Sequence, residues 1–169
     1  GLGTARERLE SDPEGGARLV ADAHDEAKAA LKEIRDLVRG IHPVILEDRG
    51  LDAALSAVVA RSAVPVSLDV DVAERPPPAV ESAAYFVVTE ALTNVARHAH
   101  ATRAAVAIAR AGDRLVVEVR DDGVGGADPD RGSGLRGLRD RVTALGGTMR
   151  LVSPPGGPTT LLVDVPCGS

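Results

Sequence analysis

The protein has 169 residues, a mass of 17.4 kDa and a formal net charge of −5. Hydrophobic residues make up 44% of the sequence and charged residues 27%, a balance that excludes a disordered chain. No apolar run approaches the length of about 18 residues that spans a membrane. Aromatic residues are nearly absent and the charge is acidic, which disfavours both base stacking and a nucleic-acid-binding surface. The single cysteine, Cys167, excludes a disulfide framework and a thiolate metal cage.

The first forty residues have the periodicity of helices. An apolar stripe runs through residues 2–9, and the sequence SDPE at 11–14 has the form of a capping box. Apolar residues then recur at three- and four-residue steps over 19–38, which predicts a long helix that ends before Gly40 and Pro43. We therefore expect residues 1–45 to be the remnant of a helical hairpin, mainly its second helix.

Residues 46–169 have the pattern of an α/β domain. In chain order we expect a helix, a strand, a helix, two hairpin strands, a helix and two closing strands, at residues 51–62, 64–72, 79–99, 102–110, 114–120, 135–145, 148–152 and 159–165. Helices and strands do not alternate regularly, as they do in a wound parallel sheet. This order predicts a two-layer α/β sandwich with about five mostly antiparallel strands and three helices.

Glycine is concentrated in two clusters, at residues 121–126 and 132–137. The second cluster directly precedes a predicted helix, whose free backbone N–H groups attract anions, so it suggests a phosphate cradle; the alternative is a mobile surface loop. The cluster also matches G-x-G-x-x-G, but it follows no strand and has no acidic residue about 20 positions later. A P-loop is excluded, because the only lysines, Lys28 and Lys32, do not follow a glycine.

The helix predicted at 79–99 is mostly apolar but carries one polar row. Glu90, Asn94 and His98 are spaced at i, i+4 and i+8, and Arg97 lies on the adjoining row. An amide oxygen such as that of Asn94 suits a hard cation, and a guanidinium suits phosphate oxygens. The alternative is an ordinary amphipathic helix with a solvated face.

Together these clusters resemble the ATP-binding domain of sensor histidine kinases, which has the Bergerat fold. The N box, the two glycine boxes and the Gly-Thr element of that family resemble TEALTNVARHA at 89–99, DDGVG at 121–125, GSGLRG at 132–137 and PGGPT at 155–159. Pro158 departs from the glycine usual in the last element. RGIHP at 39–43 resembles the end of the second dimerisation helix in the subfamily that partners response regulators with a helix-turn-helix output.

The resemblance implies ATP and Mg²⁺ as ligands. Carried over position by position, Asp121 receives the adenine amino group, Asn94 binds Mg²⁺, and Glu90 orients water or polarises the phosphoacceptor. Arg97 is implied to contact phosphates, and Thr159 to reach the adenine through water. The other positions implied to line the nucleotide site are His98, Gly123, Gly125, Gly132, Ser133, Gly134, Leu135 and Gly137.

The family's phosphoacceptor histidine is not matched in this sequence. His24 precedes an aspartate, as in the family, but it lies on the predicted second helix, and His42 is interpreted as structural. We therefore expect the acceptor upstream of Gly1. This chain should then bind ATP without phosphorylating itself, and be a monomer or a weak dimer where the intact protein is a homodimer.

The sequence as a whole predicts the catalytic part of a two-component sensor histidine kinase, which transfers the γ-phosphate of ATP to a histidine for relay to a response regulator. Two alternatives remain at this point: a serine kinase of the anti-sigma-factor type, and a non-catalytic module that binds nucleotide or pairs with a partner. We expect this part of the chain to be cytoplasmic, with any membrane anchor in upstream regions.

Overall fold

The computed structural model describes residues 44–128 and 133–168, which belong to the compact unit His42–Ser169. The expected hairpin up to residue 43, with His24 and His42, lies outside these residues, as does Gly132. The described elements are α3 (Val44–Val59), β1 (Val66–Asp71), α4 (Pro78–Asn94), a π-helical turn η1 (Val95–Ala99), β2 (Ala104–Ala111), β3 (Arg114–Asp121), α5 (Ser133–Ala144), β4 (Thr148–Val152) and β5 (Thr159–Pro166). No helix in this part of the chain is long and apolar enough to cross a membrane.

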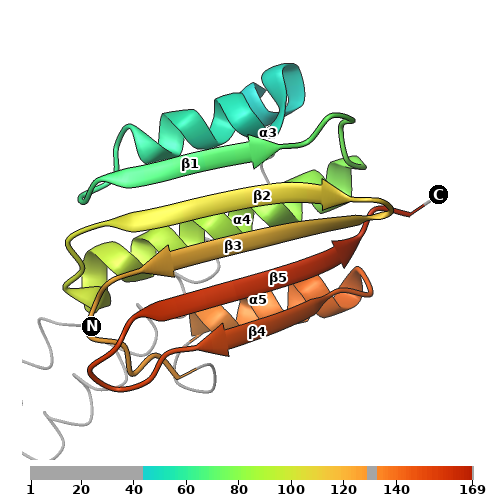
Figure 1. Ribbon diagram of the computed structural model, residues 1–169. Helices are drawn as coiled ribbons and strands as arrows, with labels where there is room; N and C mark the ends of the chain where they lie inside the picture. The colour runs from blue at the N-terminus through green and yellow to red at the C-terminus, as the bar shows by residue number, and fades with distance from the viewer. Residues whose placement is uncertain (1–43, 129–132, 169) are drawn as a thin grey trace, which may run out of the picture. The chain divides into compact units, whose positions relative to one another are not determined.

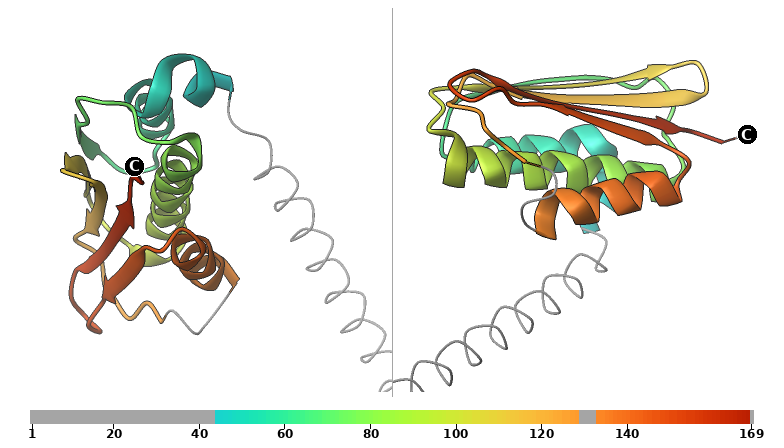
Figure 2. Two further views of the ribbon diagram at one scale, coloured as in Figure 1. Left: turned by 90° about the vertical axis from the view of Figure 1, so that its right-hand side faces the viewer. Right: turned by 90° about the horizontal axis from the view of Figure 1, so that it is seen from below.

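The strands form one sheet in the order β1-β2-β3-β5-β4, and the helices cover one face of it (Figures 1 and 2). Every neighbouring pair is antiparallel except β1 and β2, which are parallel. Helix α4 connects β1 to β2 over one face of the sheet, and two parallel neighbouring strands require such a crossover connection. The expected two-layer α/β sandwich is therefore confirmed, with the parallel edge pair as a detail that the strand pattern alone did not indicate.

The core lies between the sheet and its helices. Strands β2, β3 and β5 alternate buried and more exposed residues, as a sheet covered on one face must. In the helix layer, α3 packs on β1, α4 on β3 and β5, and α5 on β4. Small aliphatic side chains fill the interior, and Phe86 lies under the guanidinium of Arg141, whose central carbon is 4.6 Å from the ring centroid.

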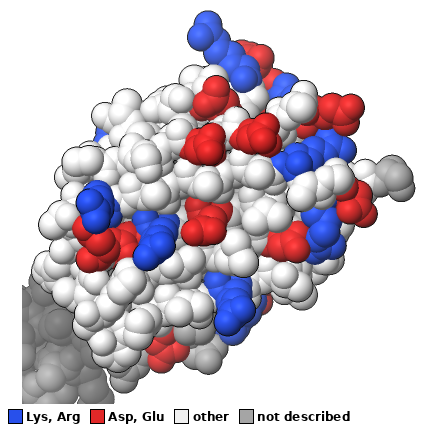
Figure 3. Space-filling view, viewed as in Figure 1, with Lys and Arg blue, Asp and Glu red and all other residues white. Residues whose placement is uncertain are grey.

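The opposite face of the sheet is open (Figure 3). Acidic and basic side chains are interspersed on it and do not gather into a basic patch. One pair bridges β3 and β5, where Arg114 donates to Asp164 at 2.6 Å. The mixed charge gives no support to nucleic-acid binding on this face.

Two helices differ from the sequence prediction at their ends. Helix α3 begins at Val44, earlier than the predicted 51–62, and kinks at Gly50, where φ is 76°. This positive φ lets two short helical segments join, and glycine adopts it without the strain that other residues incur. Helix α4 passes into the π-helical η1, which ends at Ala99 and is followed by His100 in a left-handed conformation with φ 50°.

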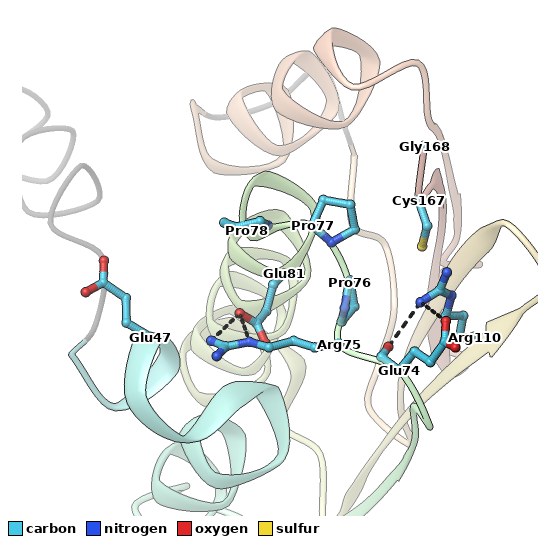
Figure 4. A pocket seen from close by; sticks show the side chains of 10 residues that line it. All are labelled: Glu47, Glu74, Arg75, Pro76, Pro77, Pro78, Glu81, Arg110, Cys167 and Gly168. Carbon is cyan, nitrogen blue, oxygen red and sulfur yellow. Dashed lines mark hydrogen bonds and ion pairs between the residues drawn. The ribbon is translucent and has the colours of Figure 1, made fainter.

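An ion pair between the half-exposed Arg75 and the buried Glu81 joins the start of α3 to the start of α4 (Figure 4). Glu81 is 3% exposed, and Arg75 donates from Nε to both of its carboxylate oxygens at 3.1 Å and from Nη2 to Oε2 at 2.8 Å. The same Nη2 donates to the carbonyl of Leu46. Arg75 and Glu81 line a pocket of about 730 Å³, in which a second pair, Arg110 and Glu74, lies 3.3 Å apart. Arg75 therefore holds the first turns of α3 against α4.

Glu81→Gln should lower the stability of the domain, because it weakens the charge-assisted hydrogen bonds that Arg75 donates to this 3% exposed side chain. Glu74→Gln is the matched control, since the Glu74 side chain is 79% exposed and solvent screens its attraction to Arg110, so the pair contributes at most about 1 kcal/mol. Urea unfolding should therefore give a clearly lower midpoint for Glu81→Gln than for Glu74→Gln. Equal midpoints for the two variants would contradict the role given to the pair of Arg75 and Glu81.

Candidate functional site

Helix α4 carries the first group of predicted site residues at its C-terminal end. Most of the helix is buried, but Glu90 and Asn94 are half-buried and lie one turn apart on the same side. Arg97 and His98 follow in η1 and are exposed. Arg97 and His98 therefore belong to a π-helical turn, which is wider than the α-helix that carries Glu90 and Asn94.

Asp121 ends β3 on the buried side of the sheet. It is 7% exposed, and its Oδ1 accepts a hydrogen bond from the Gly123 N–H at 2.9 Å. The register pairs Asp121 with Thr159, the first residue of β5. Side chains opposite one another on adjacent strands lie close together, so the two predicted adenine contacts are neighbours.

The loop after Asp121 runs so close to other backbone segments that two positions require glycine. A Cβ on Gly123 would lie 2.2 Å from the Ala99 carbonyl oxygen, at the end of η1. A Cβ on Gly125, where φ is 62°, would lie 2.1 Å from the carbonyl oxygen of Pro154 and 2.5 Å from that of Gly157. The loop is thus held between η1 and the turn that joins β4 to β5.

Backbone hydrogen bonds fix the loop in this place. The Val124 N–H donates to the Ala99 carbonyl at 2.9 Å, and the Val124 carbonyl accepts from the Gly156 N–H at 2.7 Å. The Gly126 N–H donates to the Ser153 carbonyl at 3.1 Å. The glycine box and the Gly-Thr element of the sequence therefore form one hydrogen-bonded unit.

Helix α5 brings the second glycine cluster to Glu90. A Cβ on Gly134 would lie 2.0 Å from Glu90 Oε1, so the carboxylate lies against the first turn of α5. The N-terminus of a helix attracts negative charge, which favours this contact and would equally favour phosphate oxygens. Leu135 packs against the core, whereas a Cβ on Gly137 would meet nothing within 4 Å. Gly132 lies outside the described residues, and Ser133 is the first residue of α5.

The sequence did not single out Asp122, which braces the base of the loop. Its Oδ1 accepts from the N–H groups of Thr102 at 2.8 Å and Arg103 at 3.1 Å, and its Oδ2 accepts from the Thr102 hydroxyl at 2.7 Å. The hydrogen bonds from the Thr102 hydroxyl and from these two N–H groups hold the pKa of Asp122 below its usual range. Two adjacent aspartates before a glycine were the available signal, but nothing local to them indicates Thr102.

Ser153 is the second residue that the sequence analysis missed. Its hydroxyl accepts a hydrogen bond from the Ala127 N–H at 3.0 Å and lies 2.9 Å from the Thr159 hydroxyl. It therefore contacts both the glycine loop and a predicted adenine contact. The only sequence signal is a serine at the edge of a Pro- and Gly-rich turn, a position where serine commonly bonds to nearby backbone.

Gly125→Ala should destabilise the protein more than Gly126→Ala. Both positions have positive φ, which costs an alanine about 1–2 kcal/mol, but only Gly125 also faces two carbonyl oxygens within van der Waals distance. Urea unfolding of both variants separates the backbone strain from the collision. If the two variants lose the same stability, the loop does not approach the β4–β5 turn as closely as described.

Asp122→Asn should destabilise the protein near neutral pH and progressively less in acid. A carboxylate whose folded pKa lies below its unfolded pKa contributes stability above the unfolded value, about 3.9, and loses it as pH falls through the folded value. The difference in urea midpoint between wild type and variant should therefore shrink below about pH 4. Asp69→Asn, on the exposed side of β1, is the control; a difference for Asp122→Asn that stays constant in acid would contradict the account.

Three comparisons with known proteins bear on this arrangement. Residues 79–169, which contain α4, the glycine loop, α5 and the β4–β5 turn, match the model of the histidine kinase-, DNA gyrase B- and HSP90-like ATPase family. The chain is 34% identical over 162 residues to the sensor histidine kinase NarS of Mycobacterium tuberculosis, a match that covers 89% of this chain and 37% of NarS. It is 32% identical over 154 residues to the sensor histidine kinase YxjM of Bacillus subtilis, covering 88% of this chain and 38% of YxjM.

Solved structures of histidine kinase domains also resemble this chain. The ATP-binding domain of PrrB from Mycobacterium tuberculosis aligns with a TM-score of 0.54 and 25% identity, over 70% of this chain and 92% of that domain. The histidine kinase domain of a blue-light activated kinase from Erythrobacter litoralis aligns with a TM-score of 0.54 and 28% identity, over 70% of this chain and 58% of that chain. The chain spans less than two fifths of the length of NarS and YxjM. The chain belongs to the histidine kinase-, DNA gyrase B- and HSP90-like ATPase family and contains the ATP-binding catalytic core of a histidine kinase.

Proposed function

We propose that this chain is the part of a two-component sensor kinase that binds ATP and Mg²⁺ and transfers the γ-phosphoryl group to a histidine. The observation that carries the proposal is that α4, the glycine loop and the N-terminus of α5 meet at one end of the sheet. The buried Asp121 begins the glycine loop, and the half-buried Glu90, one turn before Asn94 on α4, lies against the first turn of α5. Asp121 suits a base, Asn94 suits a cation, and the N-terminus of α5 suits a phosphate chain.

The base is proposed to bind beside Asp121 and Thr159. A buried carboxylate accepts a hydrogen bond from the adenine amino group, whereas guanine presents a carbonyl oxygen at that place and repels the carboxylate. Gly123 and Gly125 leave the backbone free of side chains that would fill the space beside the loop. This combination supports adenine as the base.

The phosphate chain is proposed to lie between α4 and α5. The first turn of α5, which begins at Ser133, supplies N–H donors, and Arg97 and His98 supply exposed cationic or polar groups on η1. The described residues hold no cluster of three or more His, Cys, Asp or Glu side chains that could bind a metal. Mg²⁺ would therefore take Asn94 and the phosphates as its ligands, which suits an ion that keeps several waters.

Glu90 is proposed as the catalytic residue. Its carboxylate reaches the first turn of α5, so it lies where the phosphate chain would meet the helix dipole. From there it can polarise the attacking imidazole or orient a water, while Asn94 holds the cation one turn further along α4. The acceptor is proposed to be a histidine upstream of Gly1.

The partners follow from the relatives. NarS and YxjM are sensor histidine kinases, which supports histidine rather than serine as the acceptor and argues against a non-catalytic module. We propose a homodimer of the intact protein, in which residues 1–45 belong to the dimerisation hairpin. A response regulator with a helix-turn-helix output would receive the phosphoryl group, as the RGIHP sequence at 39–43 suggests.

Asp121→Asn tests the nucleotide assignment. Wild type should bind ADP more tightly than GDP by about 10- to 150-fold, the value of a charge-assisted hydrogen bond, and the variant should lose most of this preference. Calorimetric titration with both nucleotides measures it, with Asp113→Asn in the β2–β3 turn as the control. Equal affinity of wild type for ADP and GDP would contradict the assignment.

Glu90→Gln tests the chemistry separately. In the full-length kinase the variant should keep its ATP affinity within about threefold and lose about 10²- to 10⁴-fold in the rate of acid-labile phosphorylation, the range of general acid–base catalysis. Glu118→Gln, on the sheet, should leave both values unchanged. A variant that keeps the wild-type rate would exclude Glu90 as the catalytic residue.

A further inference from the structure

We infer that Ser153 is a positioning residue for base recognition, which sets the direction of the Thr159 hydroxyl and so sharpens the preference for adenine over guanine. The inference rests on the proposed function, because it takes Thr159 as a contact to the base. Ser153 lies outside the four motifs that define the candidate site in the sequence. Its role follows from what its hydroxyl contacts.

The Ser153 hydroxyl has two partners in the structure. It accepts a hydrogen bond from the Ala127 N–H at 3.0 Å, and it lies 2.9 Å from Thr159 Oγ1, where either oxygen can be the donor. Thr159 in turn is registered opposite Asp121 on the adjacent strand. A chain of contacts thus runs from the end of the glycine loop through Ser153 and Thr159 to the strand position of the buried carboxylate.

Either hydroxyl can be the donor in the Ser153–Thr159 bond, and we take Ser153 as the donor. A serine hydroxyl has one hydrogen to donate and two lone pairs, and the Ala127 N–H already occupies one lone pair. If Ser153 donates to Thr159, each hydroxyl makes a bond and the hydrogen of Thr159 remains available to the base. If Thr159 donates to Ser153 instead, its hydroxyl can only accept a hydrogen bond from the base. Both Thr159 and the neighbouring Asp121 carboxylate would then be acceptors. The first arrangement presents the base with one acceptor, Asp121, and one donor, Thr159.

That pair of groups matches adenine. The adenine amino group is a donor and the adjacent ring nitrogen N1 is an acceptor, whereas guanine has a carbonyl acceptor beside an N1–H donor. Asp121 suits the amino group, and the Thr159 hydrogen suits N1, directly or through one water. In guanine the donor and acceptor positions are exchanged, so neither contact can form. A Thr159 hydroxyl held as a donor therefore raises both the affinity for adenine and the preference for adenine over guanine.

The test is a double-mutant cycle on Ser153 and Thr159, read by calorimetric titration with ADP and with GDP. Ser153→Ala should weaken ADP binding about three- to tenfold, the range for one neutral hydrogen bond, and change GDP binding little. Ser153→Thr should restore most of the loss, because it keeps the hydroxyl. In a Thr159→Ala background, Ser153→Ala should have almost no further effect, because the residue through which it acts is gone.

The cycle separates positioning from simple bracing of the loop. If Ser153 acts only by holding the Ala127 N–H, its loss weakens ADP and GDP alike and does so equally in the Thr159→Ala background, which would overturn the inference. Unchanged ADP binding in Ser153→Ala would overturn it as well. Ser56→Ala, exposed on α3, is the matched control, and urea unfolding verifies that each variant is folded. Should Ser153→Ala not fold, Ser153→Cys keeps the size and weakens the donor, and the same ADP loss is expected.

Failure of the inference and failure of the proposed function give different results. Wild type that does not bind ADP overturns the proposed function and this inference together. Wild type that prefers ADP, with Ser153 variants that keep that preference, overturns this inference alone.

Discussion

The close approach of the loop at 122–127 to two neighbouring backbones determines where the functional groups of this protein lie. On one side Val124 is hydrogen-bonded to Ala99, and on the other to Gly156. Side chains at Gly123 and Gly125 would collide with carbonyl oxygens, so the approach exists only because these residues have none. Through this loop the end of η1, the end of β3 and the turn before β5 are held within one hydrogen-bonded unit, and Asp121 stays buried.

Helix α4 connects this unit to the other end of the domain. Its N-terminal turn contains Glu81, whose carboxylate is paired with Arg75 and, through it, with the Leu46 carbonyl in α3. Glu90 lies about 2.5 turns further along the same helix. Because α4 is buried over most of its length, the position of Glu90 depends on packing against the sheet and on this ion pair together. The same helix therefore carries a structural anchor at one end and the proposed catalytic carboxylate at the other.

The amino-acid sequence was sufficient to predict those features of the fold that depend on a local pattern of residues. The polar positions Glu90 and Asn94 on an apolar helix, the Asp-x-Gly-x-Gly run after a strand and the order of elements all gave correct expectations about the fold. It was not sufficient for contacts between distant segments. Asp122 meets Thr102 and Ser153 meets Ala127 only after the sheet has formed, and neither partner is marked by spacing. The parallel pairing of β1 and the start of α3 at Val44 also depend on tertiary packing, which overrides a short local pattern.

The account's central claim is that nucleotide binds where the C-terminal end of α4 and η1, the end of β3 and the start of β5 meet, and not at the pocket beside Arg75 and Glu81. Titration of the ¹⁵N-labelled chain with ADP and Mg²⁺, followed by amide chemical shifts, tests this most directly. The account predicts saturable shifts in the amides of 121–127 and 153–159 and at the start of α5, with little change at 75–81. Shifts concentrated at 75–81, with the glycine loop unmoved, would contradict it.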